Sequence, residues 1–339
     1  MRKYSVALVG IGLVGTRILQ VLRERNFPTS SIKILARSAR TERIDGTDYE
    51  VTAASADAFQ GADIALFAGT EGAKGASRLY GWEAVKRGCV VIDNGDDFRM
   101  DERVPLVVPE VNPEALRSHR GLISNPNCST IQMIVALAPL HRAARIRRIV
   151  VTTFQSVSGA GSAAVAELER QVRDVPAGRP AQPEQYPHQI FANVIPQIST
   201  LKDICPGYYG EEIKMMRETR KILSAPDIAV SATCVRVPVS FAHSEAINVE
   251  LEKKLTAAEA REILASAPGV KVVDDPAKSK YPTPLDVAGK DEVFVGRIRE
   301  DPCHPNTLDL WCVADNIRKG AATNAIQIAE KMIEMGLIK

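Results

Sequence analysis

The sequence contains no apolar stretch that could span a membrane. A spanning helix needs about 20 consecutive apolar residues, and no uninterrupted apolar run in the 339 residues approaches that length. The N-terminus, Met1-Arg2-Lys3, leads directly into an apolar pattern and a glycine turn, without the small-residue cleavage site of a signal peptide. The sequence therefore predicts a cytoplasmic protein without a membrane partner.

The features of nucleic-acid-binding and repeat proteins are missing as well. The 43 Lys and Arg residues nearly balance the 41 Asp and Glu residues, and the formal charge is only +2. No basic stripe interleaved with aromatic residues is present, nor is any internal repeat or low-complexity tract. We therefore expect no nucleic-acid partner.

The cysteines form neither a disulfide framework nor a metal-binding pattern. They show no C-x-x-C pair and no metal-ligand spacing with histidine. The six positions are 89, 128, 205, 234, 303 and 312. This usage is typical of a reduced chain with one functional thiol, and no bound metal is expected.

The chain is longer than one compact core usually requires, so two domains are expected. Through residue 110, apolar strand patterns alternate with helical patterns. The strand patterns cover 4–9, 31–36, 64–68 and 90–93, and the helical patterns 16–22 and 82–87. This alternation predicts an α/β fold with a parallel, doubly wound sheet.

A glycine-rich turn separates the first strand pattern from the first helical pattern. Its sequence, Gly10-Ile11-Gly12-Leu13-Val14-Gly15, matches G-x-G-x-x-G in the required order of strand, turn and helix. Glycines let the backbone approach a pyrophosphate, which the helix N-terminus stabilises. We predict these residues as cofactor contacts, with a tight turn without ligand as the alternative.

The residues after the second strand pattern indicate which cofactor binds. An NAD enzyme presents an Asp or Glu there to the ribose 2′-hydroxyl, whereas this chain has Arg37 and Ser38, followed by Arg40. A guanidinium and a hydroxyl suit a 2′-phosphate, so the predicted cofactor is NADP. The loop 69–72 is expected to lie over it.

Cys128 stands at the predicted start of a helix. It follows Asn125-Pro126-Asn127 and precedes the apolar run 131–137. The unpaired N–H groups and the positive end of the helix dipole favour the thiolate, and the same groups could receive an oxyanion. The alternative is a small buried residue that opens a core helix.

Polar residues follow the strand pattern at 148–154. Gln155 comes at the strand end, and a Ser-Gly-x-Gly turn containing Ser158 and Gly159 follows. This arrangement places an amide beside a backbone that is open to a ligand.

Four further polar residues lie on a helix and near a strand. Glu211 and Lys214 share one face of a charged helix running to about residue 223, where a solvated ion pair is the default. Arg236 lies in the strand pattern 232–239, and His243 follows in a predicted loop that could direct both side chains into one pocket.

Several segments together resemble the aspartate-semialdehyde dehydrogenase family, over nearly the whole chain. They are the sequences NPNCST at 125–130, FQSVSGAG at 154–161, RVPV at 236–239 with His243, and ADNIRKG at 314–320. The resemblance implies a Rossmann-like NADP-binding domain over 1–127, completed by 314–339. It also implies an α+β catalytic and dimerisation domain over 128–313, in a homodimer or a tetramer of paired dimers.

The family's chemistry implies roles for individual residues. In that family a cysteine thiolate attacks the aldehyde, hydride passes to NADP, and phosphate cleaves the thioester. The biosynthesis of lysine, threonine and methionine runs these steps backwards, from L-aspartyl-4-phosphate to L-aspartate 4-semialdehyde. By resemblance, Cys128 is the nucleophile, His243 the acid/base group, and Gln155 orients the intermediate.

The resemblance also implies binding residues. Arg236 would hold the substrate carboxylate, and Glu211 would face its ammonium group. The positions that match phosphate contacts are Arg99, Lys214 and Asn127, and those that match cofactor contacts are Ser158, Gly159 and Asn316.

The chain departs from the family pattern in three places. Val9 stands at the first glycine of G-x-x-G-x-x-G, with Gly10 extra, and Ala242 replaces a glycine before the histidine. Asp96 and Asp97 precede Arg99 where small or hydroxyl residues are usual. A carboxylate about 4 Å from a bound phosphate would oppose it by about 4 kcal/mol at an effective dielectric of about 20. We therefore expect both carboxylates to point away from the phosphate and to orient the loop.

Two other functions are compatible with parts of the pattern. N-acetyl-glutamyl-phosphate reductase uses a similar cysteine and histidine, but its cysteine usually lies between Asn-Pro-Gly and Tyr, and its substrate has no free ammonium group for Glu211. A non-catalytic paralogue would be expected to have lost the nucleophile, which this chain retains.

Overall fold

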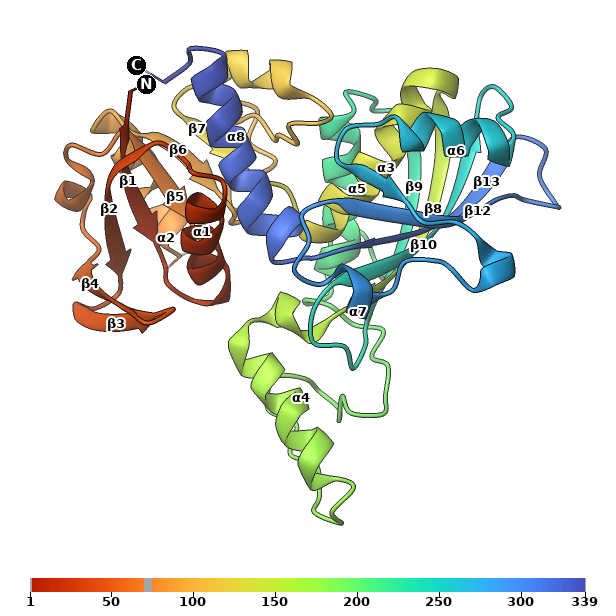
Figure 1. Cartoon of the computed structure of the whole chain (residues 1–339), viewed down its shortest axis with the longest axis horizontal. Coiled ribbons are helices and arrows are strands. Elements are labelled where there is room, and N and C mark those ends of the chain that lie inside the picture. Colours follow the sequence, from red (N-terminus) through yellow and green to blue (C-terminus); the bar gives the residue numbers. More distant parts are fainter. Residues whose placement is uncertain (1, 70–74, 339) are drawn as a thin grey trace. The chain divides into compact units, whose positions relative to one another are not determined.

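The computed structural model describes residues 2–69 and 75–338, drawn in Figure 1, and divides the chain into two compact units. The first consists of Met1–Asn127 and Ala321–Lys339, and the second of Cys128–Gly320.

The first unit is built on a seven-stranded sheet with the order β3-β4-β2-β1-β5-β6-β7. All neighbouring strands are parallel except β3, which pairs antiparallel with β4. The strands are β1 (Tyr4–Val9), β2 (Thr29–Ala36), β3 (Arg40–Ile44), β4 (Thr47–Ala53), β5 (Ile64–Phe67), β6 (Val90–Asp93) and β7 (Leu122–Ser124). The α/β class and the parallel sheet predicted from the sequence are confirmed.

Helices cover both faces of this sheet because its central strands are apolar on both sides. Val6 and Leu8 of β1 pack with α1 (Leu13–Glu24) and α8 (Thr323–Glu334), whereas Ala7 and Val9 belong to the cluster that includes α2 (Ala76–Lys86). The C-terminal helix α8 therefore belongs to the core of the first unit, although the whole second unit separates it in sequence from the other elements of the first unit. Two 3₁₀ helices, η1 (Ala56–Phe59) and η2 (Pro113–Ser118), complete the unit.

The second unit contains a mixed six-stranded sheet with the order β11-β12-β13-β10-β8-β9. The strands are β8 (Ile146–Gln155), β9 (Ala229–Arg236), β10 (His243–Leu251), β11 (Val270–Val272), β12 (Val293–Glu300) and β13 (Thr307–Ala314). The helices are α3 (Cys128–Ala144), α4 (Ser162–Asp174), α5 (Gly210–Ile222), α6 (Ala257–Ala265) and the short α7 (Pro284–Val287), with 3₁₀ turns η3 (Val157–Ala160) and η4 (Pro276–Lys278) and the π-helix η5 (Arg318–Ala322).

The two faces of this second sheet are covered differently. Helices α3, α5 and α6 pack on one face, while α4 extends away from the sheet (Figure 1). Side chains on the other face, including Phe154 and Trp311, remain partly exposed, and these two rings pack with centroids 5.7 Å apart.

The structure corrects the expected position of His243. It does not lie in a loop but is the first residue of the central strand β10, where it pairs with Ala314 of β13. Strand β9 ends at Arg236, earlier than the pattern to residue 239 suggested. Pro238 has no N–H group with which to continue a ladder, so the chain leaves the sheet and re-enters it at His243.

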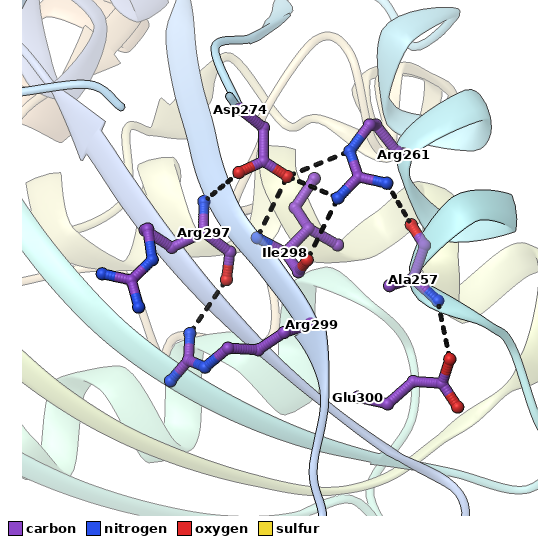
Figure 2. Close-up of polar contacts among 7 residues, drawn as sticks. All are labelled: Ala257, Arg261, Asp274, Arg297, Ile298, Arg299 and Glu300. Carbon is purple, nitrogen blue, oxygen red and sulfur yellow. Dashed lines mark hydrogen bonds and ion pairs between the residues drawn. The ribbon is translucent and has the colours of Figure 1, made fainter. Parts of the chain in front are cut away.

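A buried carboxylate stabilises an irregular stretch of β12 (Figure 2). Oδ1 of Asp274 accepts from the backbone N–H of Arg297 at 2.7 Å, and Oδ2 accepts from Nη2 of Arg261 at 2.7 Å and from the N–H of Ile298 at 3.3 Å. The pairing with β13 shifts register here, and Arg297 adopts a left-handed φ of 50°. Asp274 therefore satisfies the N–H groups that the irregularity removes from the ladder.

Among the described residues, none of the helices combines the length and the apolar character needed to cross a membrane.

Candidate active site

The glycine turn after β1 brings strand and helix into direct backbone contact. Gly10 has a φ of 91°, which glycine adopts without strain. A Cβ on Gly15 would lie 2.1 Å from the carbonyl oxygen of Gly10, so a larger residue at 15 would push α1 away from the strand end. Gly12 precedes α1 without a side-chain cap, and the first turn carries no acidic residue. These features fit a pyrophosphate at the helix N-terminus.

Arg37 and Ser38 follow directly after β2, at the carboxyl end of the parallel sheet, and both are exposed. Within residues 2–69 and 75–338, no hydrogen bond or ion pair is formed by the Arg37 side chain. Arg40, in contrast, is bound by Glu42 at 2.6 Å. Arg37 therefore suits an anionic group of a ligand. The loop expected over the cofactor lies, from Thr70 onward, outside the described residues.

Arg99 is buried and joins two loops of the first unit. Its Nε donates to the carbonyl of Asn125 at 3.0 Å, and its Nη2 donates to the carbonyl of Asn94 at 2.7 Å. Asp97 lies 3.5 Å from Nε of Arg78. Asn127 is buried and is the last residue of the N-terminal segment of the first unit. Arg99 thus keeps a fixed guanidinium beside the Asn-Pro-Asn segment.

Cys128 is the first residue of α3, as predicted from the sequence. The first turn of this helix contains no acidic residue, so the dipole and the N–H groups favour a thiolate at this position. A Cβ on Gly320 would lie 2.7 Å from the Cβ of Cys128. The chain after β13 therefore returns to pack against Cys128.

His243 is fully buried, and Ser156 holds one of its ring nitrogens. The backbone N–H of Ser156 donates to Nδ1 at 3.0 Å, and the Ser156 hydroxyl also lies 3.0 Å from Nδ1. No polar atom within the described part of the chain hydrogen-bonds Nε2. Burial, together with the Arg236 guanidinium, lowers the pKa of His243 well below its usual value, so the ring is neutral near pH 7.

Gly159, Arg236 and His243 converge at one point. A Cβ on Gly159 would lie 2.9 Å from Nη1 of Arg236 and 3.2 Å from Nε2 of His243. Arg236 donates from Nη1 to the carbonyl of Ser156 at 2.6 Å, while Nε, although buried, has no partner among the described residues. The structure thus unites the three residues that the sequence placed in separate segments.

Gln155 and Glu211 also meet in the second unit. Nε2 of Gln155 donates to Oε1 of Glu211 at 3.2 Å, and Nζ of Lys214 lies 3.9 Å from Oε2 of Glu211. The sequence predicted a solvated ion pair between Glu211 and Lys214. This prediction is wrong for the Glu211 carboxylate, because Glu211 is only 6% exposed. Helix α5 packs against β9, and this packing buries the face that carries Glu211.

The sequence analysis did not single out two residues that lie near these groups, Tyr186 and Glu245. The ring of Tyr186 lies 5.9 Å from the Arg236 guanidinium, yet its segment shows only a proline-rich loop pattern. Glu245 is fully buried beside Gln132, one helical turn beyond Cys128, and burial raises the pKa of this carboxyl well above its usual value. The position of Glu245 two residues after a candidate histidine was the only available signal, because alternate strand residues face the same side.

The second unit thus combines a thiol at a helix start, a neutral imidazole, a buried guanidinium and a buried carboxylate. A thiolate can attack a carbonyl carbon. A buried arginine and a buried glutamate suit a substrate that carries both a carboxylate and an ammonium group.

Comparison with known proteins identifies the family. Residues 5–119 match the family model of the semialdehyde dehydrogenase NAD binding domain, and residues 137–319 match that of the semialdehyde dehydrogenase dimerisation domain. The aspartate-semialdehyde dehydrogenase of Aquifex aeolicus is 49% identical over 346 residues, which cover 99% of each chain. The chain belongs to the aspartate-semialdehyde dehydrogenase family.

Other members of the aspartate-semialdehyde dehydrogenase family agree with this assignment. The Legionella pneumophila enzyme is 50% identical over 346 residues, covering 100% of this chain and 98% of the other. The crystal structure of aspartate semialdehyde dehydrogenase II from Vibrio cholerae aligns with a TM-score of 0.92 at 45% identity, over 98% of this chain and 99% of the other. The family resemblance predicted from the sequence is confirmed.

Proposed function

We propose that this chain reduces L-aspartyl-4-phosphate to L-aspartate 4-semialdehyde with NADPH, through a thioester on Cys128. The observation that carries the proposal is Cys128 at the first position of α3, in a unit that also contains neutral His243. This reaction supplies the biosynthesis of lysine, threonine and methionine. A cytoplasmic location is part of the proposal, supported by six cysteines that are all thiols within the described residues.

The thiolate of Cys128 attacks the acyl phosphate carbon, and phosphate leaves. The helix N-terminus stabilises the thiolate and the oxyanion that forms on attack. NADPH, which the glycine turn after β1 and Arg37 with Ser38 would hold, would supply the hydride. His243 is the acid/base residue of the proposal, and Gln155, hydrogen-bonded to Glu211, orients the intermediate.

Substrate selection rests on two buried groups. Nε of Arg236 is buried without a partner among the described residues, which supports binding of the substrate carboxylate. Glu211 supports binding of the ammonium group. We assign the phosphate to Arg99, Asn127 and Lys214.

The cofactor contacts are proposed in both units. The turn Gly10-Ile11-Gly12-Leu13-Val14-Gly15 would hold the pyrophosphate, and Arg37 with Ser38 the 2′-phosphate of NADP. Ser158, Gly159 and Asn316 are the proposed contacts in the second unit. The proposed domain limits are 1–127 with 314–339, and 128–313. The compact units described above share the limit at 127/128 and differ at the second limit, where they assign residues 314–320 to the second unit.

We propose a homodimer, with a tetramer of paired dimers as the alternative. The match to the dimerisation domain model supports it, as does the sheet face that carries Phe154 and Trp311. These two large aromatic side chains remain partly exposed, whereas the opposite face of the same sheet packs against α3, α5 and α6.

The test is reduction of NADP by L-aspartate 4-semialdehyde, measured with and without phosphate. We expect phosphate-dependent turnover in the parent protein, none in Cys128→Ala, and unchanged NADP binding in that variant. Substantial turnover by Cys128→Ala, or no activity in the parent protein, would contradict the proposed function. The same assay with N-acetylglutamate semialdehyde tests the alternative substrate.

A further inference from the structure

The segment 184–195 binds the backbone of Arg236. Arg236 is the last residue of β9 and is 4% exposed. Its N–H donates to the carbonyl of Ile195 at 2.8 Å, and the N–H of Ile195 donates to the carbonyl of Arg236 at 2.9 Å. The segment 184–195 therefore extends the sheet by one bridge, at the residue whose side chain is proposed to bind the substrate carboxylate.

The same segment places an aromatic ring against the side chain of Arg236. Cζ of Arg236 lies over the ring of Tyr186, 5.9 Å from its centroid, which is within the range of about 6 Å for a cation–π contact. Burial raises the pKa of the Tyr186 phenol, so it is neutral near pH 7. Its hydroxyl donates to the carbonyl of Val157 at 3.4 Å, which is long for such a bond. The ring, rather than the hydroxyl, is therefore the main contribution of Tyr186.

Two buried side chains of α4 fix the backbone on both sides of Tyr186. Oε2 of Glu167 accepts from the N–H groups of residues 184 and 185 at 3.0 and 2.6 Å. Oε1 of Gln171 accepts from the N–H groups of residues 190 and 191, both at 3.0 Å. Nε2 of Gln171 donates to Oε1 of Glu167 at 3.1 Å, and each residue is 1% exposed. Buried bonds to a carboxylate are costly to lose, so α4 determines where the ring lies.

The Arg236 guanidinium is thereby held at two places. Nη1 donates to the carbonyl of Ser156 at 2.6 Å, and the Tyr186 ring lies against the guanidinium carbon. Nε is buried and has no partner among the described residues, so it is available to a ligand. A guanidinium that is already ordered loses less conformational entropy when it binds a carboxylate.

We propose that Tyr186, fixed by Glu167 of α4, is a positioning residue that orders the Arg236 guanidinium for the carboxylate of the substrate. Tyr186 acts through Arg236 and determines how strongly the protein selects a substrate that carries this carboxylate. The assignment of the carboxylate to Arg236 rests on the proposed function, whereas the ordering of the guanidinium does not.

The kinetic test replaces the ring. Tyr186→Leu keeps apolar volume but removes the aromatic face, so we expect KM for L-aspartate 4-semialdehyde to rise about tenfold, roughly 1.4 kcal/mol. We expect kcat to change by less than about threefold, because the reacting groups are untouched, and KM for NADP and phosphate to stay the same. Tyr186→Phe retains the ring and should retain the parental KM. The control Tyr281→Leu, at a tyrosine that is 40% exposed, should also leave KM unchanged.

A second variant tests the support from α4. Glu167→Ala removes the acceptor of two backbone N–H groups and should raise the same KM, whereas Glu169→Ala, at an exposed residue of the same helix, should not. A parental KM in Tyr186→Leu, or an equal rise in Tyr186→Phe, would overturn the role of the ring. A parental KM in Glu167→Ala would overturn the role of α4.

The order of the guanidinium can be measured without turnover. In ¹H–¹⁵N spectra of the substrate-free protein, the Nε–H signal that disappears in Arg236→Lys identifies Arg236. We expect one sharp signal in the parent and in Tyr186→Phe, and a broadened or split signal in Tyr186→Leu. An unchanged signal in Tyr186→Leu would contradict the inference even if the enzyme is active. A parent protein that shows the expected signals but no turnover would instead contradict the proposed function.

Discussion

Gly320 lies so close to Cys128 that a Cβ on the glycine would be 2.7 Å from the Cβ of the cysteine and 3.3 Å from its Cα. Neither carbon belongs to the flexible end of a side chain, so Gly320→Ala must displace the start of α3 or the segment around residue 320. Displacements of about 1 Å at a reacting group can cost about 10²-fold in rate. We expect kcat of Gly320→Ala to fall by about this factor. The control is Gly178→Ala, whose Cβ would meet nothing within 4 Å but whose φ of 77° strains any side chain. It therefore reports the effect of a strained glycine substitution that does not touch Cys128, and its kcat should stay near that of the parent. Equal kcat values for parent and Gly320→Ala would contradict the prediction.

The cofactor preference is tested at Arg37. Removing its guanidinium takes away the charge proposed to bind the 2′-phosphate, so Arg37→Ala should raise KM for NADP at least about tenfold, roughly 1.4 kcal/mol, and leave KM for NAD nearly unchanged. Arg40→Ala is the matched control, because Glu42 already binds that guanidinium. A parent enzyme with equal kcat/KM for NAD and NADP would rule out this origin of specificity.

Asp97 and Asp96 are expected not to oppose phosphate. The Asp97 carboxylate lies 3.5 Å from Nε of Arg78, which neutralises part of its charge. Asp97→Ala and Asp96→Ala should therefore change the phosphate KM of semialdehyde oxidation by less than about threefold. A decrease of about tenfold or more, roughly 1.4 kcal/mol, in either variant would show that the removed carboxylate faces the anion.

Glu245 should make the protein less stable as pH rises. The groups beside it are uncharged: Gln132 on α3, and Thr153 and Cys312, which pair with it from the adjacent strands. Burial raises the pKa of Glu245 well above its usual value, so the folded state keeps a proton that the unfolded state loses above about pH 4.3.

In the interval between these two pKa values, the free energy of unfolding of the parent should fall by about 1.4 kcal/mol per pH unit from this group alone. Glu245→Gln removes the titration. The difference in unfolding free energy between variant and parent should therefore increase with pH in the variant's favour. Denaturant unfolding at fixed protein concentration between about pH 5 and 8 measures it. A difference that is constant over this range would contradict the prediction.

Asp274 should matter for stability and not for chemistry. Asp274→Ala would leave the N–H groups of Arg297 and Ile298 and the partly exposed guanidinium of Arg261 without their acceptor. Loss of these bonds should lower the free energy of unfolding by about 2–4 kcal/mol. The control Asp275→Ala removes a carboxylate that forms an exposed ion pair with Lys278, and it should cost less than about 1 kcal/mol. A smaller loss in Asp274→Ala than in the control would contradict this role.

The local sequence pattern was sufficient to predict the first element of each unit, β1 and α3. The run at 4–9 forms β1 with the predicted limits, and Cys128 opens α3 as predicted. In both places a single physical cause dominates: an apolar run buried on both faces of a sheet, or a helix that starts directly after a turn. The sequence thereby determined the α/β class, the glycine turn and the candidate nucleophile.

Only the tertiary structure decided how the remaining groups meet. It placed His243 on the central strand β10, because that residue pairs with Ala314 across the sheet. It also brought Ser156 to Nδ1 of His243 over a separation of 87 residues and packed Gly320 against Cys128. Contacts of this kind depend on strand order and register, which are set by the burial of whole faces and not by local preference. The residue types at the site were therefore readable from the sequence, whereas the hydrogen bonds of His243, the burial of Glu211 and Glu245, and the space around the thiol were fixed by long-range packing.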